Sequence, residues 1–297
     1  MSAIATVSLG KCYRNRWALR DCTVSVPAGR VVGLVGTNGA GKSTFLHLTA
    51  GLAGATEGIV TVAGEPQRGT AAQLARIGFL AQDAPTYRSL TVEEHLHLGA
   101  RLNASFDSGF AQDRVRRLGL DPRQRAGGLS GGQRSQLALT LAMGKRPELL
   151  LLDEPVAALD PLAHREFLQD LMELVAEHEP TVVLSSHLLA DVDRVCDHLI
   201  VLVNGRVRLA GDVDVLLAQH RNLTGPRRDL TTLPANQKVI RMSHTDRQTT
   251  AVIRTREPVL DPRWVVTEIG LEDLVLAYMT TDAASDPGPA SLEAVRS

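Results

Sequence analysis

The nine residues from Gly36 to Thr44, GTNGAGKST, constrain this chain more than any other stretch. They match the phosphate-loop pattern G-x-x-x-x-G-K-[ST] at every fixed position. Glycines let a main chain turn tightly around a phosphate and offer it several N–H donors. Lys42 adds a point charge at the β- and γ-phosphates, and the Ser43 hydroxyl is placed to ligate Mg²⁺. We therefore predict a nucleoside triphosphate bound by Gly36, Thr37, Asn38, Gly39, Ala40, Gly41, Lys42, Ser43 and Thr44.

The flanking residues favour this interpretation over a glycine-rich turn that merely resembles the pattern. Residues 30–35 form a short apolar run that is typical of a buried parallel strand. Residues 43–50 have the composition of the first turns of a helix. Strand, glycine loop and helix, in this order, are the setting that a phosphate loop requires.

Size and composition set outer limits on the kind of protein. The 297 residues suffice for one large domain or for one domain with an appendage. A net charge of −1 gives no reason to expect a nucleic-acid partner. Three scattered cysteines without metal-ligand spacing predict reduced structural thiols (Cys12, Cys22 and Cys196). We see no signal peptide and no apolar stretch near the roughly 18 residues of a membrane span. We expect a cytoplasmic protein whose membrane role needs a partner.

Three polar or aromatic side chains stand at positions suited to a nucleotide. Gln82 follows the predicted strand at residues 77–80, and His187 follows the one at residues 181–186. Ligands bind at this end of the strands in open α/β sheets, so we expect Gln82 to reach the metal or the γ-phosphate and His187 to contact the γ-phosphate. Taken alone, a polar residue such as Gln82 or His187 after a strand is more often an ordinary loop residue. Tyr13, on a loop between two predicted strands, is a candidate for stacking on the base.

The stretch LLLLDEP, residues 149–155, predicts a fully buried strand that ends in two carboxylates. Neighbouring residues on a strand point in opposite directions, so the two carboxylates should have different tasks. Asp153 is placed to hold Mg²⁺, and Glu154 to polarise the water that attacks the γ-phosphate. An acidic turn without chemistry is the alternative, and the phosphate loop in the same domain argues against it. The catalytic candidates are Lys42, Glu154 and His187.

Residues 83–128 differ in character and predict a mainly helical insert. Thr91 to Glu94 fit a capping box at the start of a helix. The insert ends in LSGGQ, residues 129–133, ahead of another helical pattern. Ser130 and the two glycines after it would start that helix with open backbone donors, which makes a second anion-binding device. One nucleotide rarely needs two such devices.

Together these motifs resemble those of the ATP-binding subunit of ABC transporters, over about residues 3–217. The match consists of the phosphate loop, Gln82, LSGGQ, LLLLDEP, ALD at residues 158–160, and His187. A phosphate loop alone marks many enzymes, whereas LSGGQ just ahead of the DEP strand is very specific. The resemblance implies a P-loop NTPase fold of the ABC type, which is α/β with a parallel-sheet core, an antiparallel β subdomain and a helical insert.

The resemblance also implies how the parts cooperate. Two such domains pair head to tail, as a homodimer or a heterodimer, and each ATP lies between one copy's phosphate loop and the other's LSGGQ. ATP and Mg²⁺ are the implied cofactors, and Mg-dependent ATP hydrolysis coupled to transport is the implied activity. The residues implied to reach the partner's ATP are Ser130, Gly131, Gly132, Gln133 and Asp160 of the dimer-contact loop. Those implied at the chain's own ATP are Tyr13 on adenine, Gln82 as metal sensor beside Ser43 and Asp153, and His187 as the switch.

A single nucleotide-binding domain without membrane spans implies, within this family, a separately encoded membrane permease. The helical insert is the family's docking surface for that subunit, and Pro85 to Leu102 is our candidate contact. The chain is then expected on the inner face of the cell membrane, held there by the permease.

We predict three parts of the chain, and the last two carry less information. The nucleotide-binding domain spans residues 1–217, with its helical subdomain at 83–128. A small, basic α+β domain at 218–281 follows, with strand-like pieces at 238–241 and 250–253 and a break at 223–226. The tail at 282–297 is expected to be disordered. The helix at 270–279 resembles the closing helix of export-type members, including drug and antibiotic exporters, so we predict export.

Two other functions compete with a transporter motor. A non-transport ATPase of the same superfamily, acting in translation or DNA repair, usually carries two such domains or a long coiled coil, and neither is found here. A regulatory module that binds ATP and barely hydrolyses it is disfavoured by the presence of Glu154 and His187.

Overall fold

The computed structural model describes residues 2–83, 86–157, 159–227, 234 and 236–280. The predicted tail at 282–297 and Pro85 of the predicted docking segment lie outside these residues. Within the described part of the chain, every helix is too short or too polar to traverse a bilayer. Cys12, Cys22 and Cys196 are free thiols, as predicted.

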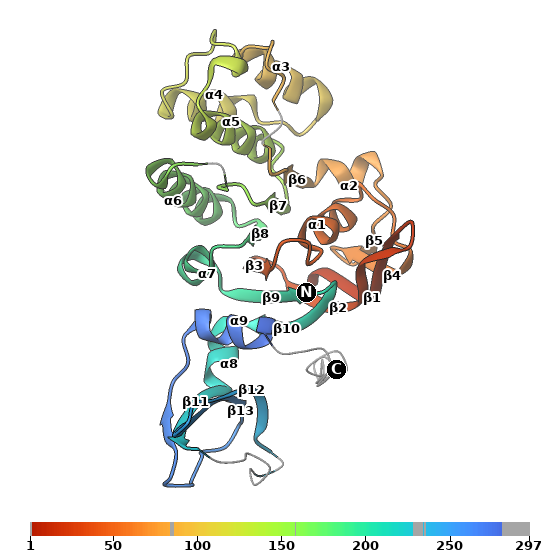
Figure 1. Cartoon of the computed structure of the whole chain (residues 1–297). Helices are drawn as coiled ribbons and strands as arrows, with labels where there is room; N and C mark the ends of the chain where they lie inside the picture. Colours follow the sequence, from red (N-terminus) through yellow and green to blue (C-terminus); the bar gives the residue numbers. More distant parts are fainter. Residues whose placement is uncertain (1, 84–85, 158, 228–233, 235, 281–297) are drawn as a thin grey trace.

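A six-stranded sheet forms the centre of the molecule, in the order β10-β9-β3-β8-β7-β6 (Figure 1). Five of its strands run parallel: β3 (Val31–Gly36), β6 (Ile77–Leu80), β7 (Leu149–Asp153), β8 (Thr181–Ser186) and β9 (His198–Val203). The sixth, β10 (Arg206–Asp212), returns antiparallel to β9. Because parallel strands end together, this topology brings the phosphate loop, Gln82, Asp153 and His187 to one edge.

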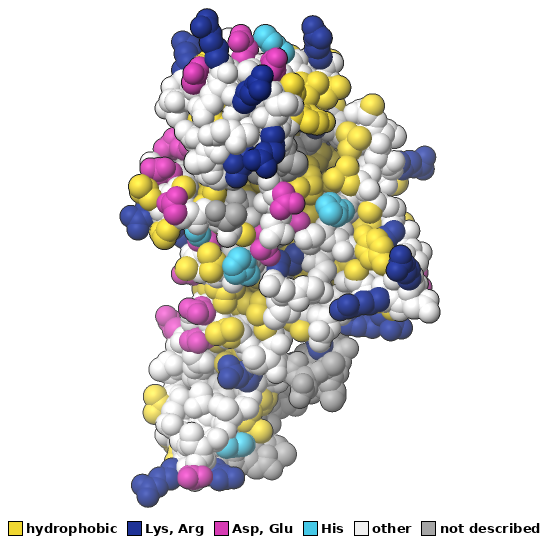
Figure 2. Space-filling view, turned by 45° about the horizontal axis from the view of Figure 1, so that its top comes forward, with side chains coloured by type: hydrophobic (Ala, Val, Ile, Leu, Met, Phe, Trp, Pro, Cys, Tyr) yellow, Lys and Arg dark blue, Asp and Glu magenta, His cyan; other side chains and the backbone are white. Residues whose placement is uncertain are grey.

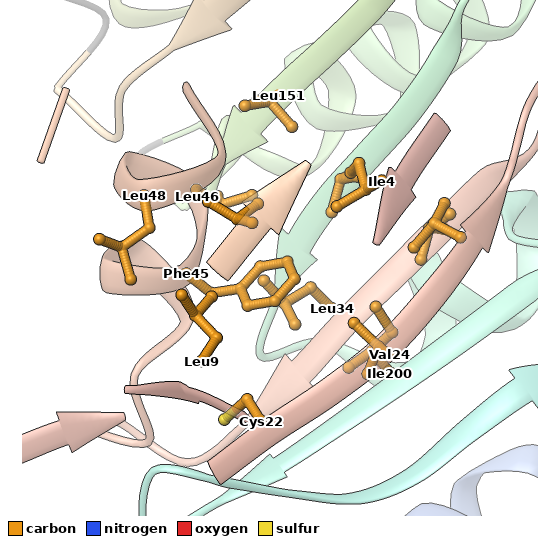
Figure 3. Close-up of a cluster of buried hydrophobic side chains, with 14 of the residues drawn as sticks. Ile4, Leu9, Cys22, Val24, Leu34, Phe45, Leu46, Leu48, Leu151 and Ile200 are labelled. Carbon is orange, nitrogen blue, oxygen red and sulfur yellow. The ribbon is translucent and has the colours of Figure 1, made fainter. Parts of the chain in front are cut away.

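A second, antiparallel sheet packs against the first through α1 (Lys42–Ala50). Its order is β2-β1-β4-β5, from β1 (Ser2–Tyr13), β2 (Arg16–Pro27), β4 (Glu57–Val62) and β5 (Glu65–Pro66); the short α2 (Ala71–Ala75) follows β5. Figure 3 shows the apolar layer between them, where Phe45 of α1 lies among Leu9, Val24, Leu34 and Ile200. Each of these side chains is almost fully buried, so apolar burial joins the two sheets.

The first two strands are longer than the sequence predicts. The pattern of apolar residues indicates strands only at residues 4–9 and 20–26. Both continue past these limits through β-bulges, where the register of β1 against β2 shifts. Ser8 and Asp21 take left-handed backbone angles at φ +45° and +52°. A bulge interrupts the two-residue alternation, so the pattern hides the rest of the strand.

The helical insert lies at one end of the molecule (Figure 1). It contains α3 (Val92–Leu102), α4 (Ser108–Arg117), a 3₁₀ turn (Ala126–Gly128) and the start of α5 (Gly131–Gly144). The predicted capping box is confirmed, because Thr91 Oγ1 accepts from the N–H of Glu94 and the Glu94 carboxylate accepts from the N–H of Thr91. The insert has its own apolar cluster, which includes Val92, Val115 and Leu137.

The C-terminal part forms a third sheet in the order β12-β13-β11-β14. Its elements are α8 (Val213–Ala218), β11 (His220–Pro226), β12 (Lys238–His244), β13 (Gln248–Arg254), β14 (Val265–Thr267) and α9 (Leu271–Thr280). The predicted break at residues 223–226 is wrong: these residues belong to β11 and pair with β13. Pro226 is compatible with the strand because it is its last residue. Helix α9 returns to the main domain and shares an apolar cluster with β9.

Candidate nucleotide site

A cavity of about 770 Å³ opens beside the phosphate loop at the carboxyl edge of the central sheet. Its lining includes predicted residues from four segments of the chain, namely Tyr13, Asn38 to Thr44, Gln82 and Glu154. It also includes five residues that sequence reasoning missed, which are Arg16, Trp17, Ala18, Asn204 and Gly205. The cavity thus joins the phosphate loop, the strand-end residues and one wall from the antiparallel sheet.

The loop needs glycine at two positions for conformational reasons. Gly39 and Gly41 have φ of +80° and +107°, which side-chain-bearing residues rarely adopt. A Cβ on Gly41 would also lie 2.5 Å from the carbonyl oxygen of Ala18. The N–H of Ala40 donates to Thr37 O at 3.0 Å and closes the turn. Helix α1 begins directly after Gly41, so its open N–H groups face the cavity and suit an anion.

Lys42 places a buried cation at this helix start. Its ammonium donates to Gly36 O at 2.9 Å and lies 3.2 Å from Glu154 Oε1. Glu154 shares its other carboxyl oxygen with His187, whose Nδ1 is 3.2 Å from Oε2. The three predicted catalytic residues therefore form a series of contacts, from Lys42 to Glu154 and from Glu154 to His187, although they come from three different segments of the chain. His187 itself is about half exposed and does not line the cavity.

The backbone at Glu154 explains how its side chain reaches Lys42. Strand β7 ends at Asp153, and Glu154 has a left-handed φ of +44°. The Glu154 N–H donates to Ser185 Oγ at 2.8 Å, and that hydroxyl donates to Asp153 Oδ1 at 2.8 Å. The two carboxylates have different partners, and Glu154 stands in a turn after the strand, where the strand alternation that we assumed does not apply. A strained residue held by its surroundings is typical of a functional site.

The predicted metal ligands offer the oxygen donors that Mg²⁺ accepts. They are the Ser43 hydroxyl, the Gln82 amide oxygen and the Asp153 carboxylate. Ser43 and Gln82 line the cavity, and Asp153 is buried next to Ser185. Among the described residues no three His, Cys, Asp or Glu side chains gather into a metal cluster. This all-oxygen donor set fits a hard cation such as Mg²⁺ that also binds phosphate oxygens and water.

Tyr13 ends β1 at the rim of the cavity. Its ring is 48% exposed, and the Lys11 ammonium lies 5.1 Å from the ring centre. A half-exposed aromatic residue in the cavity lining suits stacking on a base.

The predicted second anion-binding device lies at the start of α5, and its residues are not in the lining of this cavity. The Ser130 hydroxyl accepts from the N–H of Gln133, and the Gln133 side chain accepts from the N–H of Ser130. This capping box leaves the N–H groups of Gly131 and Gly132 at the open end of the helix. Asp160 likewise caps α6 (Pro161–His178) by accepting from the N–H groups of Leu162 and Ala163.

The missed wall of the cavity is the turn between β9 and β10. The N–H of Gly205 donates to Ala40 O at 3.1 Å, and Gly205 O accepts from the N–H of Arg20 at 2.8 Å. The Cys22 thiol donates to the same oxygen at 3.2 Å. Burial raises the pKa of Cys22 to about 11, which keeps the thiol protonated as a donor. Asn-Gly is a dipeptide that favours such hairpin turns, but only the strand order places this turn beside the phosphate loop.

We expect Gly205→Ala to weaken ATP binding about tenfold, or about 1.4 kcal/mol. Gly205 has a φ of +75°, and a Cβ there would lie 2.8 Å from Ala18 O. The turn would have to move away from β2 and lose its hydrogen bond to the phosphate loop. Titration calorimetry with ATP measures the effect. Gly64→Ala is the matched control, because Gly64 has a φ of +82° with no atom within 4 Å of the added Cβ. Equal affinities of the two variants would contradict the supporting role.

Comparisons with known proteins agree with this geometry. Residues 19–157 match the family model described as ABC transporter. The chain is 34% identical over 220 residues to the Uncharacterized ABC transporter ATP-binding protein YxlF of Bacillus subtilis (strain 168), covering 72% of each chain. It is 32% identical over 201 residues to the Thiamine import ATP-binding protein ThiQ of Salmonella choleraesuis (strain SC-B67), covering 66% of this chain and 86% of that one. It is 34% identical over 208 residues to the Molybdenum import ATP-binding protein ModC of Aromatoleum aromaticum (strain DSM 19018 / LMG 30748 / EbN1), of which it spans 55%.

Solved structures show the same fold. One is described as the structure of the ATP binding subunit of an ABC transporter; it is 30% identical, has a TM-score of 0.65, and the match covers 72% of this chain and 92% of that one. Another, the ADP conformation of MJ1267, an ATP-binding cassette of an ABC transporter, is 26% identical with a TM-score of 0.64 over 72% of this chain and 92% of that one. The predicted fold class is confirmed.

Proposed function

The chain belongs to the ATP-binding subunits of ABC transporters, and from this premise we propose that it hydrolyses Mg-ATP between two paired domains to drive a separate membrane permease. The contact series Lys42, Glu154 and His187, of which the first two residues line a nucleotide-sized cavity, carries the proposal. A protein that only bound ATP would not need a carboxylate held at this position.

The chemistry follows from the contacts that an incoming triphosphate replaces. Phosphate oxygens compete with Glu154 for the Lys42 ammonium, and Glu154 Oε1 becomes free to accept a proton from a water. His187 and the Ser185 hydroxyl hold the rest of Glu154 in place during this change. Ser43, Gln82 and Asp153 would hold Mg²⁺, which supplies positive charge for the phosphate oxygens. Tyr13 would stack on the adenine.

A second copy, of this chain or of a related one, completes the site in our proposal. The helix start at Gly131 and Gly132 is an anion-binding device that its own cavity does not use. It would stabilise the γ-phosphate bound to the partner copy, with Ser130, Gln133 and Asp160 beside it. The redundancy of two anion devices in one chain supports this arrangement.

The permease has a suitable docking place in a groove of about 410 Å³ between the helical insert and the core. Its lining is largely apolar, from Leu52, Phe79, Tyr87, Leu98 and Leu102 among others. Figure 2 shows hydrophobic side chains gathered beside the helical end of the molecule. Tyr87 and Leu102 are strongly exposed, so the groove lacks a cover within the described part of the chain. We assign it to a permease segment, which would place the chain peripherally on the inner face of the membrane.

Our proposal for the direction of transport depends on the C-terminal helix α9. Export was predicted from the helix at residues 270–279, and the structure has α9 there. ThiQ and ModC, however, are named as import proteins, so the comparisons do not support the export prediction. Export therefore rests on the helix alone, and the permease sequence would decide it.

A pull-down from detergent-solubilised native membranes, with tagged Glu154→Gln chain and ATP, tests the proposal. We expect a multi-spanning membrane protein in near-equal amount. Recovery of ribosomes or DNA-bound complexes alone would instead favour a non-transport ATPase. Recovery of neither would favour the regulatory module.

A substitution in the groove extends the pull-down to a test of the docking place. We expect Leu102→Glu to reduce recovery of the membrane protein at least about tenfold, because a charge in an apolar contact is desolvated without a partner. Leu102 is 72% exposed, so folding and ATP affinity should be unchanged. The control is Leu260→Glu, a residue 86% exposed in the C-terminal part. Undiminished recovery with Leu102→Glu would exclude the groove as the docking place.

A further inference from the structure

Two loops at the carboxyl edge of the sheet are joined where they leave their strands. The first follows β7 and leads from Glu154 to Asp160 at the start of α6. The second follows β8 and carries His187 into α7 (Leu189–Val195). Glu154 Oε2 lies 3.2 Å from His187 Nδ1, and the Glu154 N–H donates to Ser185 at the end of β8. The sheet ends of the two loops therefore form one unit.

The same two loops are joined again where they enter their helices. Nε2 of His164, in the first turn of α6, lies 2.9 Å from Oδ1 of Asp191, in the first turn of α7. Both side chains are largely buried. Among the described residues, no protein group donates a hydrogen bond to the second carboxyl oxygen of Asp191. His164 is thus the side chain on which this buried carboxylate depends.

His164 is also tied to the residue that we place at the dimer contact. The N–H of His164 donates to Asp160 O at 2.9 Å, and Asp160 caps the same helical turn with its side chain. A displacement of Asp160 therefore moves His164 with it. Through Asp191 the displacement reaches α7 and the short loop that carries His187. Hydrogen bonds thus join Asp160 to His164 and His164 to Asp191. The backbone of residues 187–191 links Asp191 to His187, which in turn contacts Glu154.

We propose that His164 and Asp191 are a positioning pair. The pair fixes the positions of His187 and Glu154 relative to Asp160, so that the pairing of two copies controls ATP hydrolysis. The inference rests on the proposed function, in which Asp160 meets the second copy and Glu154 acts on ATP. Neither His164 nor Asp191 lines the nucleotide cavity. The pair acts through the loops and not on ATP itself.

Kinetics of the full-length chain test this pair. We expect His164→Ala and Asp191→Ala each to lower kcat about tenfold, because small misplacements of catalytic groups cost this much or more. KM for ATP and the Kd of ATP should stay unchanged, since the cavity is intact. The double variant should be no slower than either single variant, because both changes remove one contact. His164→Gln, which keeps a side-chain N–H donor, should recover at least about half of the kcat of the original chain.

The control is His178→Ala, at the far end of α6, where His178 contacts Arg146 instead. Its kcat should remain within about twofold of the original chain. The same small change in the His164 or Asp191 variants would overturn the proposal. The proposal would also be overturned if the two losses of kcat multiplied in the double variant. A joint fall of ATP affinity, thermal midpoint of unfolding and kcat in the single variants would overturn it as well. If the alanine variants fail to fold, His164→Leu fills the same space without a donor and permits the same comparison.

Failure of the proposed function would look different. The original chain would then show no ATP hydrolysis, or Glu154→Gln would hydrolyse ATP at the original rate. Both results are obtained without any variant of the positioning pair.

Discussion

Replacing Glu154 by Gln is expected to lower ATP turnover about 10²- to 10⁴-fold, the range for loss of a general base. The amide has nearly the size of the carboxylate and keeps the backbone contact with Ser185. It cannot accept the proton of the attacking water. Because ATP still binds, the variant should accumulate as an ATP-bound dimer, which size-exclusion chromatography with and without ATP detects.

Glu148→Gln is a matched control for this variant. Glu148 lies just before β7, pairs with Arg76 at the molecular surface and is well exposed. We expect unchanged turnover and no trapped dimer. If Glu154→Gln hydrolyses ATP as fast as Glu148→Gln, another group is the base and our assignment fails.

Replacing Lys42 by Ala is expected to weaken ATP binding at least about 100-fold. The change removes charge-assisted hydrogen bonds to phosphate, each worth about 1.5–3 kcal/mol. It also leaves the Glu154 carboxylate without its cation, so that negative charge faces the incoming phosphates. Titration calorimetry or a fluorescent ATP analogue measures the loss, with Lys238→Ala on β12 as control.

The Lys42–Glu154 contact allows a sharper form of this test. The double variant Lys42→Ala with Glu154→Gln should bind ATP more tightly than Lys42→Ala alone, because it no longer carries the uncompensated carboxylate. Equal affinities would show that Glu154 does not influence the phosphates. Unchanged affinity in Lys42→Ala itself would refute the phosphate-loop assignment.

Local motifs predicted the parts of the site well, because each motif has its own short-range geometry. The phosphate loop, the capping box at Thr91, the helix start at Ser130 and the cap at Asp160 all depend on residues a few positions apart. The structure forms each of them as the sequence indicates.

The relations between distant segments were not predictable in the same way. The cavity wall at Asn204 and Gly205 depends on β9 lying next to β3, which follows from the strand order and from no local pattern. The contact between Lys42 and Glu154 depends on a left-handed turn that the alternation of a strand does not indicate. The direction of transport is not predictable from the hydrolysis site, because this site has the same residues whichever way a substrate moves.

Because α9 packs against β9, the apolar face of β9 stays uncovered during part of the synthesis of the chain. Val201 and Val203 of β9 share their apolar cluster with Leu274, Val275 and Tyr278 of α9. Ribosomes add roughly 5–20 residues per second, so β9 leaves the exit tunnel several seconds before its cover does. During that interval the nascent chain presents an apolar strand face to the cell, and a chaperone has its best opportunity to bind there.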